Sequence, residues 1–243
     1  SAAQVTLRAD YMNLAAGSIN SGAGLLLVRS DNDAQLITLG AGSSGLGLSN
    51  GELVTLVGVL QIGAATHTGG IAVDGPVTLS NPAATLNTLG GVSFGSSFSA
   101  PETLTVNGGS IASANGTESG TNMVFNAPTG AVSFGNNVTA SGTLTVNGGS
   151  ISAMSGNVSG TDVAFTAVGG VLIQPGASAT QAVNVIASGN LTISGATVDV
   201  FGSDTTAGLG AKLTAANAIT IVSPDVIVGG GIAANAPASI DPA

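Results

Sequence analysis

The sequence contains no cysteine and no tryptophan, and only 6% of its 243 residues are charged. Without cysteine, a disulfide framework and thiolate chemistry are both excluded. The three cationic residues, Arg8, Arg29 and Lys212, stand against 12 acidic residues, which gives a net charge of −9. Nucleic acids and anionic membrane surfaces attract proteins through clustered lysine and arginine. The composition therefore argues against nucleic acid as a partner and against docking on such a membrane.

Long apolar runs are also missing, although the mean hydropathy is +0.52. Apolar residues come in threes and fours, and each run is broken by asparagine, serine or one of the 38 glycines. A membrane helix needs 18 or more apolar residues in succession, so we expect no membrane insertion. The apolar residues are instead expected in many short buried strands joined by tight turns.

The two ends of the chain differ from its middle. Ser1–Val5 has neither an initiator methionine nor the basic start and apolar core of a signal peptide, so we expect a mature or excised piece of a longer protein. Residues 229–243 are a mixture of glycine, alanine, asparagine and proline. Because Pro237 and Pro242 cannot donate to a strand ladder, we expect this segment to be a tail or a linker.

An internal repeat occupies the middle of the chain. Residues 92–131 and 132–171 align without gaps, and 21 of the 40 positions are identical. The run Thr103–Ile111 returns unchanged as Thr143–Ile151. Repeats of this length are typical of proteins in which similar units stack and each unit contacts only its neighbours.

Apolar triplets with a small polar centre, such as Leu104-Thr-Val106, recur throughout the chain. Since side chains alternate along a strand, the outer two residues of a triplet face the same side. Strands of about three residues are too short for a sandwich or a barrel. Inward positions recur at nearly equal intervals. The successive intervals are 19, 21, 19 and 20 residues, between Leu104, Met123, Leu144, Val163 and Val183.

This spacing predicts an all-β fold, a single parallel β-solenoid with about 20 residues per rung. Each rung would lie on the one before it, with hydrogen bonds along the long axis and about 4.8 Å between rungs. Dividing 243 residues by 20 gives roughly 12 rungs, and we expect residues 1–228 to form them. One rung cannot offset the entropy of ordering its own residues, so neighbouring rungs must stabilise each other.

Several side chains can be placed in this scheme. Phe94 with Phe134, and Phe125 with Phe165, occupy equivalent places in the two copies of the repeat. Each pair is therefore expected inside, two rungs apart in the same column. Asparagines before glycine pairs, which suit sharp corners, are expected to form a ladder of side-chain amides. They are Asn107 and Asn147.

One segment departs from the strand pattern. Ser49 precedes Glu52 by three residues, which is the spacing of a capping box. Leu53 and Leu56 follow at helical spacing. We therefore expect a single helical turn that bulges from the wall; a further strand over Leu53–Leu56 is the alternative.

Between Val5 and Leu79 the sequence resembles the long repeat region of filamentous-haemagglutinin-like exoproteins. The resemblance rests on Ile37-Thr-Leu-Gly40, Leu46-Gly-Leu-Ser49, Leu60-Gln-Ile-Gly63 and Gly70-Ile-Ala-Val73, in that order. It implies a right-handed parallel β-helix and a large Gram-negative surface protein exported by two-partner secretion through an outer-membrane transporter. It also implies an extracellular location, adhesion and biofilm cohesion. It supplies no catalytic motif, and no residue is assigned a catalytic, cofactor-binding or metal-binding role.

Few residues carry groups that could do chemistry. His67 is the only histidine; we expect it in a turn at the surface, and a metal site would need a second histidine or a cysteine. A β-helix enzyme acting on polysaccharides would need clustered carboxylates. Arg29, Asp31 and Asp33 would share one side if extended, but a solvated turn fits them better. Asp199 and Asp204 have no evident partner.

A column of outward hydroxyls gives a further hypothesis, a flat face that binds glycans or ice. Its irregular spacing argues against it, because serine and threonine are also ordinary outward residues of strands. The residues are Thr105, Ser133, Thr145, Thr192 and Thr220.

Three functions are consistent with these features. The first is a non-enzymatic shaft of a secreted adhesin, which contacts a cell-surface receptor or glycan. The second is the subunit of an extracellular filament, in which copies of the chain stack end to end through open strand edges. The third is a polysaccharide lyase or hydrolase. No cofactor is expected.

Overall fold

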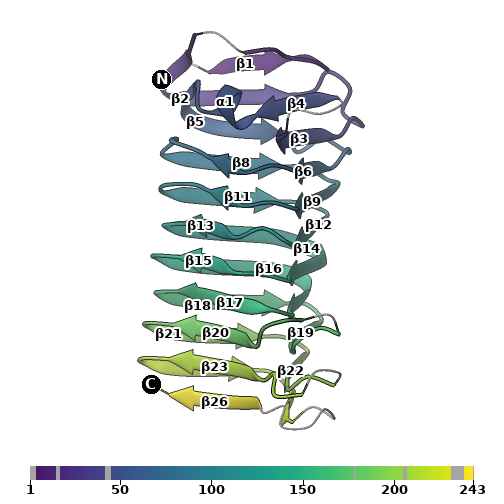
Figure 1. Cartoon of the computed structure of the whole chain (residues 1–243), viewed down its shortest axis with the longest axis vertical. Coiled ribbons are helices and arrows are strands. Elements are labelled where there is room, and N and C mark those ends of the chain that lie inside the picture. The colour runs from purple at the N-terminus through teal and green to yellow at the C-terminus, as the bar shows by residue number, and fades with distance from the viewer. Residues whose placement is uncertain are drawn as a thin grey trace.

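The computed structural model describes residues 4–14, 17–41, 45–177, 179–204, 207–230 and 238–242. Within them the fold is all-β, and the one helix, α1 (Asn50–Leu53), is a single turn. Every strand pairing among these residues is parallel. The strands lie in layers that follow one another along the long axis, with the N-terminus at one end and the C-terminus at the other (Figure 1).

The strands form three columns, which we call faces 1, 2 and 3. In the described part of the chain, face 1 contains ten strands: β1 (Val5–Arg8), β2 (Ile19–Arg29), β5 (Leu56–Gly63), β8 (Ala83–Asn87), β11 (Thr103–Asn107), β14 (Asn122–Phe134), β16 (Thr143–Ala153), β18 (Asp162–Ala167), β21 (Asn190–Ser194) and β24 (Ala218–Val222). Face 2 contains β4 (Leu46–Ser49), β3 (Ile37–Gly40), β6 (Ile71–Val73), β9 (Gly91–Phe94), β12 (Ser110–Ser113), the second halves of β14 and β16, β19 (Gly170–Ile173), β22 (Thr197–Phe201) and β25 (Asp225–Gly229). Face 3 contains β7 (Val77–Thr78), β10 (Phe98–Ser99), β13 (Glu118–Gly120), β15 (Val138–Ala140), β17 (Gly156–Gly160), β20 (Val183–Ala187), β23 (Ala211–Ala215) and β26 (Ala238–Pro242).

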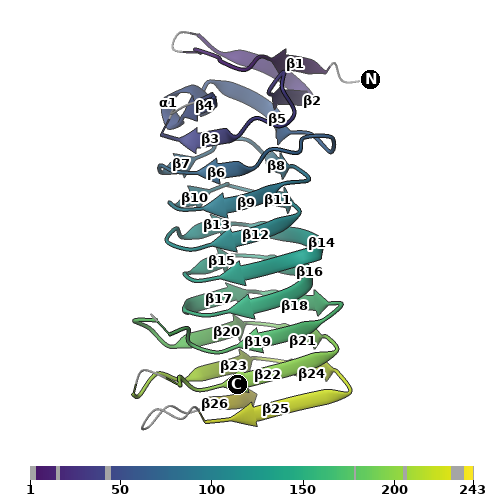
Figure 2. The ribbon, with the colours of Figure 1, turned by 90° about the vertical axis from the view of Figure 1, so that its right-hand side faces the viewer.

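Faces 1 and 2 belong to one sheet, because β14 and β16 run continuously from the first into the second. Face 3 is a separate sheet. Figure 2 shows how the chain passes from face to face within a layer before it enters the next layer. The apolar interior is enclosed between the two sheets, and the triplets explain why: Leu104 and Val106 are fully buried, while Thr105 between them is only partly covered.

The strand register confirms the predicted spacing in the middle of the chain and corrects it afterwards. Leu104 pairs with Met123, Met123 with Leu144 and Leu144 with Val163, as expected. The next interval is longer, because Val163 pairs with Leu191. Val183 lies on face 3, opposite Gly156. The interval lengthens because an additional segment, of which residues 174–177 and 179–182 are described, connects faces 2 and 3 and projects from the stack in Figure 2.

The phenylalanine prediction is confirmed. Phe94 and Phe134 both align with Ser113, one layer to either side of it, and Phe125 and Phe165 both align with Val146. All four rings are fully buried. Phe125 contacts Phe134 with ring centroids 5.3 Å apart and planes at 75°. Such edge-to-face pairs add about 0.5–1.5 kcal/mol beyond the burial of area.

The predicted amide ladder is present at the corner between faces 1 and 2. Asn126 Nδ2 donates to Asn107 Oδ1 at 2.9 Å, and Asn147 Nδ2 donates to Asn126 Oδ1 at 2.8 Å. Asn126 was missed from the sequence because no glycine pair follows it. The ladder satisfies polar groups at a corner where neighbouring layers approach closely.

The helical turn is confirmed and lies near the N-terminal end of the stack. Ser49 caps α1, and both hydrogen bonds of the capping box with Glu52 are present. Strand β5 begins only at Leu56, so the alternative strand over Leu53–Leu56 is wrong. Asn50 Oδ1 accepts a hydrogen bond from the backbone N–H of Thr78 at 2.7 Å. Thus α1 covers the outer edge of face 3 at this end.

The expected tail is partly corrected. Ala238–Pro242 forms β26 and pairs with β23, so these residues extend face 3. Pro242 occupies the last position of an edge strand, where a missing N–H is tolerated. Residues 231–237 and Ala243 of this segment lie outside the described residues. Beside β26, Val226 and Val228 of β25 are each 44% exposed, whereas their partners Val198 and Val200 are fully buried.

Candidate functional site

The turn between β2 and β3, residues 30–36, carries Asp31 and Asp33, and Arg29 immediately precedes it. It is held by hydrogen bonds rather than extended. The hydroxyl of Ser30, which is fully buried, donates to Asp10 Oδ1 at 2.6 Å, and the backbone N–H of Asn32 donates to the same oxygen at 2.7 Å. The Ser30 hydrogen bond is the main cause of the lowered pKa of Asp10. The predicted turn is therefore confirmed after Arg29, which is itself the last residue of β2.

The carboxylates of this turn point to different partners. Arg29 Nη2 lies 2.6 Å from Asp33 Oδ1, and this hydrogen bond is the main cause of the lowered pKa of Asp33. Asp31 instead pairs with Arg8, whose Nε lies 2.6 Å from Asp31 Oδ1 on the exposed surface. Arg29, Asp31 and Asp33 thus belong to two separate ion pairs, one of them with Arg8, and the two carboxylates do not form one cluster.

His67 lies beneath this turn, and the expectation of a surface histidine is wrong. Its side chain is fully buried. The next layer covers it: the carbonyl of His67 accepts hydrogen bonds from the Leu89 N–H at 2.7 Å and from the Thr88 hydroxyl at 2.9 Å. Neither ring nitrogen has a hydrogen bond of good geometry to a described residue. Burial is the main cause of its lowered pKa, and the charge of Asp33 opposes this shift.

The pKa of His67 can be tested directly, because the chain has one histidine. We expect its imidazole proton resonances to titrate in the native protein below the value of about 6.5 that is found in unfolded chains. The same resonances in denaturant provide the control. Because the folded state resists protonation of this ring, the His67 contribution to stability is lost as pH falls below about 6.5. A native pKa at or above that of the denatured chain would contradict the buried, neutral ring.

The turn between β2 and β3 lies over His67, so Arg29 and Asp33 come close to the imidazole ring. The sequence did not predict this, because residues 34–66 separate Asp33 from His67 along the chain. The enclosed imidazole cannot contact a substrate unless the layer above opens. Among the described residues, no group of three or more His, Asp or Glu side chains is placed to hold a metal ion. Asp199 lies in β22, and Asp204 in the following turn accepts a hydrogen bond from Gln174 Nε2 at 2.9 Å.

The outward hydroxyls do not form one uninterrupted column. On face 1, Val124 lies between Thr105 and Thr145, and Ala164 lies between Thr145 and Thr192. The remaining two hydroxyls also differ in position. Thr220 follows Thr192 on face 1, whereas Ser133 lies on face 2. Apolar side chains therefore interrupt the face that would bind glycans or ice.

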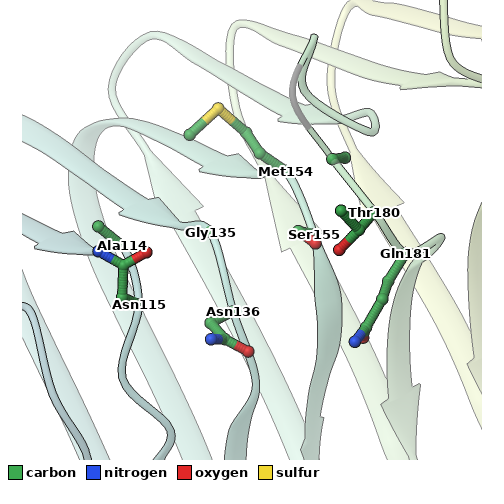
Figure 3. Close-up of a pocket in the computed structure, with 9 residues that line it drawn as sticks. Ala114, Asn115, Gly135, Asn136, Met154, Ser155, Thr180 and Gln181 are labelled. Atoms are coloured by element: carbon green, nitrogen blue, oxygen red, sulfur yellow. The ribbon is translucent and has the colours of Figure 1, made fainter. Parts of the chain in front are cut away.

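A groove of about 440 Å³ lies at the corner between faces 2 and 3. Figure 3 shows Asn115, Asn136 and Ser155 on successive turns, with Gln181 on the longer loop beyond them. Met154 adds an apolar side chain to its lining. None of the described residues that line the groove is charged, so it can hydrogen-bond a polar molecule but offers no acid or base. The sequence carried no signal for this loop, because Val183 continues the interval of about 20 residues although it lies on face 3.

Comparison with protein-family models, with curated proteins and with solved structures finds no match to this chain. Within the part of the chain that the structure describes, no helix is both long and apolar enough to cross a membrane.

Proposed function

We propose that the chain is a right-handed parallel β-solenoid that serves as the shaft of a secreted, filamentous-haemagglutinin-like bacterial adhesin. The observation that carries this proposal is the unbroken parallel pairing of face 1 from β1 to β24. In such a stack the backbone hydrogen bonds run along the long axis, so each layer is bonded to the next. The shaft has no catalytic activity of its own and acts as a stiff spacer.

The proposed partners follow from this role. The shaft projects a binding surface towards a receptor or glycan on a cell, or contacts it weakly at many points along its length. During export it passes through an outer-membrane transporter. The absence of cysteine is compatible with this route, because no disulfide has to form.

A filament formed by end-to-end stacking is the second candidate. The exposed apolar side chains of β25, Val226 and Val228, favour it. Against it, the Thr78 N–H at the opposite end of face 3 already donates a hydrogen bond to Asn50 Oδ1 of α1. Head-to-tail stacking would have to displace this helical turn, so we prefer the shaft.

Negative-stain electron microscopy and light scattering on the purified chain distinguish the two. The shaft predicts monomeric rods about 45 Å long, from ten face 1 strands about 4.8 Å apart. Continuous fibres would favour the filament, and compact globular particles would contradict both. Adhesion itself is tested by displaying the chain on a non-adherent bacterium. Retention on host cells or on sister cells should exceed that of bacteria displaying an equal amount of an unrelated domain, and equal retention would contradict the adhesive role.

A further inference from the structure

A carboxyl group lies in the middle of the apolar interior and has no part in the proposed function. Glu118 is the first residue of β13, and its side chain is fully buried. In the strand register it stands between Phe98 of the preceding layer and Val138 of the following one. Both of these neighbours are fully buried as well. The sequence does not predict this burial, because Glu118 follows the segment Asn115-Gly-Thr117, which is typical of an exposed turn.

Among the described residues, only one polar side chain reaches this carboxyl group. The hydroxyl of Ser113 donates to Glu118 Oε2 at 2.7 Å. Ser113 itself is almost fully buried and stands between Phe94 and Phe134. The second oxygen, Oε1, is buried without a hydrogen-bond partner in the described part of the chain. A carboxylate in this position would therefore keep one oxygen desolvated and unpaired.

No opposite charge on the strands around it compensates the carboxyl group. The strands packed against it, β9, β10, β12, β14 and β15, contain no Asp, Glu, His, Lys or Arg. The two nearest acidic residues before it along the chain, Asp74 and Glu102, have exposed side chains outside the interior. Burial accordingly raises the pKa of Glu118 to about 7, and the Ser113 hydrogen bond only partly offsets this rise.

The internal repeat contains the apolar version of the same site. In the second copy, Ala153 and Val158 stand where Ser113 and Glu118 stand in the first. They occupy the same two columns, two layers further along, and both are fully buried. The backbone thus accommodates either pair. The chain itself shows that this position does not require a carboxyl group in order to fold.

We propose that Glu118 and Ser113 form a proton-dependent latch within the stack. When the carboxyl group is neutral, it shares a hydrogen bond with Ser113 and the layers before and after it close over the pair. When the group ionises, the layer that contains β12 and β13 opens to hydrate the carboxylate. The stack is then tight in mildly acidic surroundings and locally loosened above neutral pH.

The direction in which stability changes with pH follows from the pKa of Glu118 in the unfolded and in the folded chain. In the unfolded chain the carboxyl group ionises near 4.5, and in the folded chain near 7. Between these values the folded state binds more protons, so stability is fully present below about pH 4.5 and is lost as pH rises towards 7. The difference of about 2.5 pH units corresponds to a change of about 300-fold in the folding equilibrium.

The test compares urea unfolding of three proteins between pH 4.5 and 8.5, with hydrogen exchange of the β12 and β13 amides as the local readout. We expect the wild type to lose about 150-fold in its folding equilibrium over this range relative to Glu118→Gln, because half of the unfolded carboxyl groups are already ionised at pH 4.5. The double variant Ser113→Ala/Glu118→Val, which copies the second repeat, should also lack this loss. Every protein in the set keeps His67, so its opposite contribution cancels in the comparison.

Glu102→Gln is the matched control, because it removes an exposed carboxyl group and should keep the wild-type pH dependence. Parallel pH dependence of the wild type, Glu118→Gln and the double variant would overturn the proposal. So would exchange at β12 and β13 that, after correction for the intrinsic rate, is unchanged by pH in the wild type. If Glu118→Gln does not fold, the double variant alone decides the outcome.

Discussion

Replacing Phe125 by alanine is expected to lower the free energy of unfolding by about 3–5 kcal/mol. The ring is fully buried, and it links two layers through edge-to-face contacts with Phe94 and Phe134, whose centroids lie 6.4 and 5.3 Å away. Alanine would remove these contacts and leave a cavity. The neighbouring layers cannot collapse into that cavity, because their backbones are held apart by the strand hydrogen bonds.

The loss can be measured by urea unfolding followed by far-ultraviolet circular dichroism. Phe201→Ala is the control, because this ring lies at the end of β22 and is only partly buried. We expect the control to lose distinctly less stability than Phe125→Ala. Equal losses of unfolding free energy in the two variants would mean that the contacts of Phe125 with Phe94 and Phe134 contribute nothing beyond ordinary burial. A loss of less than about 1 kcal/mol for Phe125→Ala would contradict the packed interior itself.

Gly40→Ala is expected to lower the free energy of unfolding by about 2–5 kcal/mol for a different reason. Gly40 is the last residue of β3 and has φ at 90°, and a methyl group there would overlap the carbonyl group of Gly75 in the stacked turn. A left-handed conformation costs a residue with a Cβ about 1–2 kcal/mol. Overpacking against a backbone that cannot move costs about 1–3 kcal/mol more.

Gly51→Ala is the matched control for this substitution. Gly51 lies in α1, and the nearest atom to its added methyl group would be Ser49 Oγ at 3.9 Å. Alanine also has the higher helix propensity, so this variant should be neutral or more stable by up to about 1 kcal/mol. Thermal unfolding of both variants gives the comparison. Similar melting temperatures for Gly40→Ala and the wild type would show that the two turns are not in contact.

The sequence by itself determined the parts of the fold that depend on local spacing. The internal repeat placed Phe94 with Phe134 and Phe125 with Phe165, because layers of equal length bring equivalent positions into one column. The capping residues Ser49 and Glu52 marked α1 for the same kind of reason, since a capping box acts within one helical turn. These features need no knowledge of which strand lies beside which.

The tertiary structure decided what depends on pairing between distant segments. The additional residues between β19 and β20 place Val183 on face 3 instead of face 1, because residues added at a corner shift every later position. The same pairing covered His67 with the turn at Thr88 and enclosed Glu118 between Phe98 and Val138. Whether a polar residue near a turn is solvated or buried depends on the layers above and below it, and only the stacking of those layers determines it.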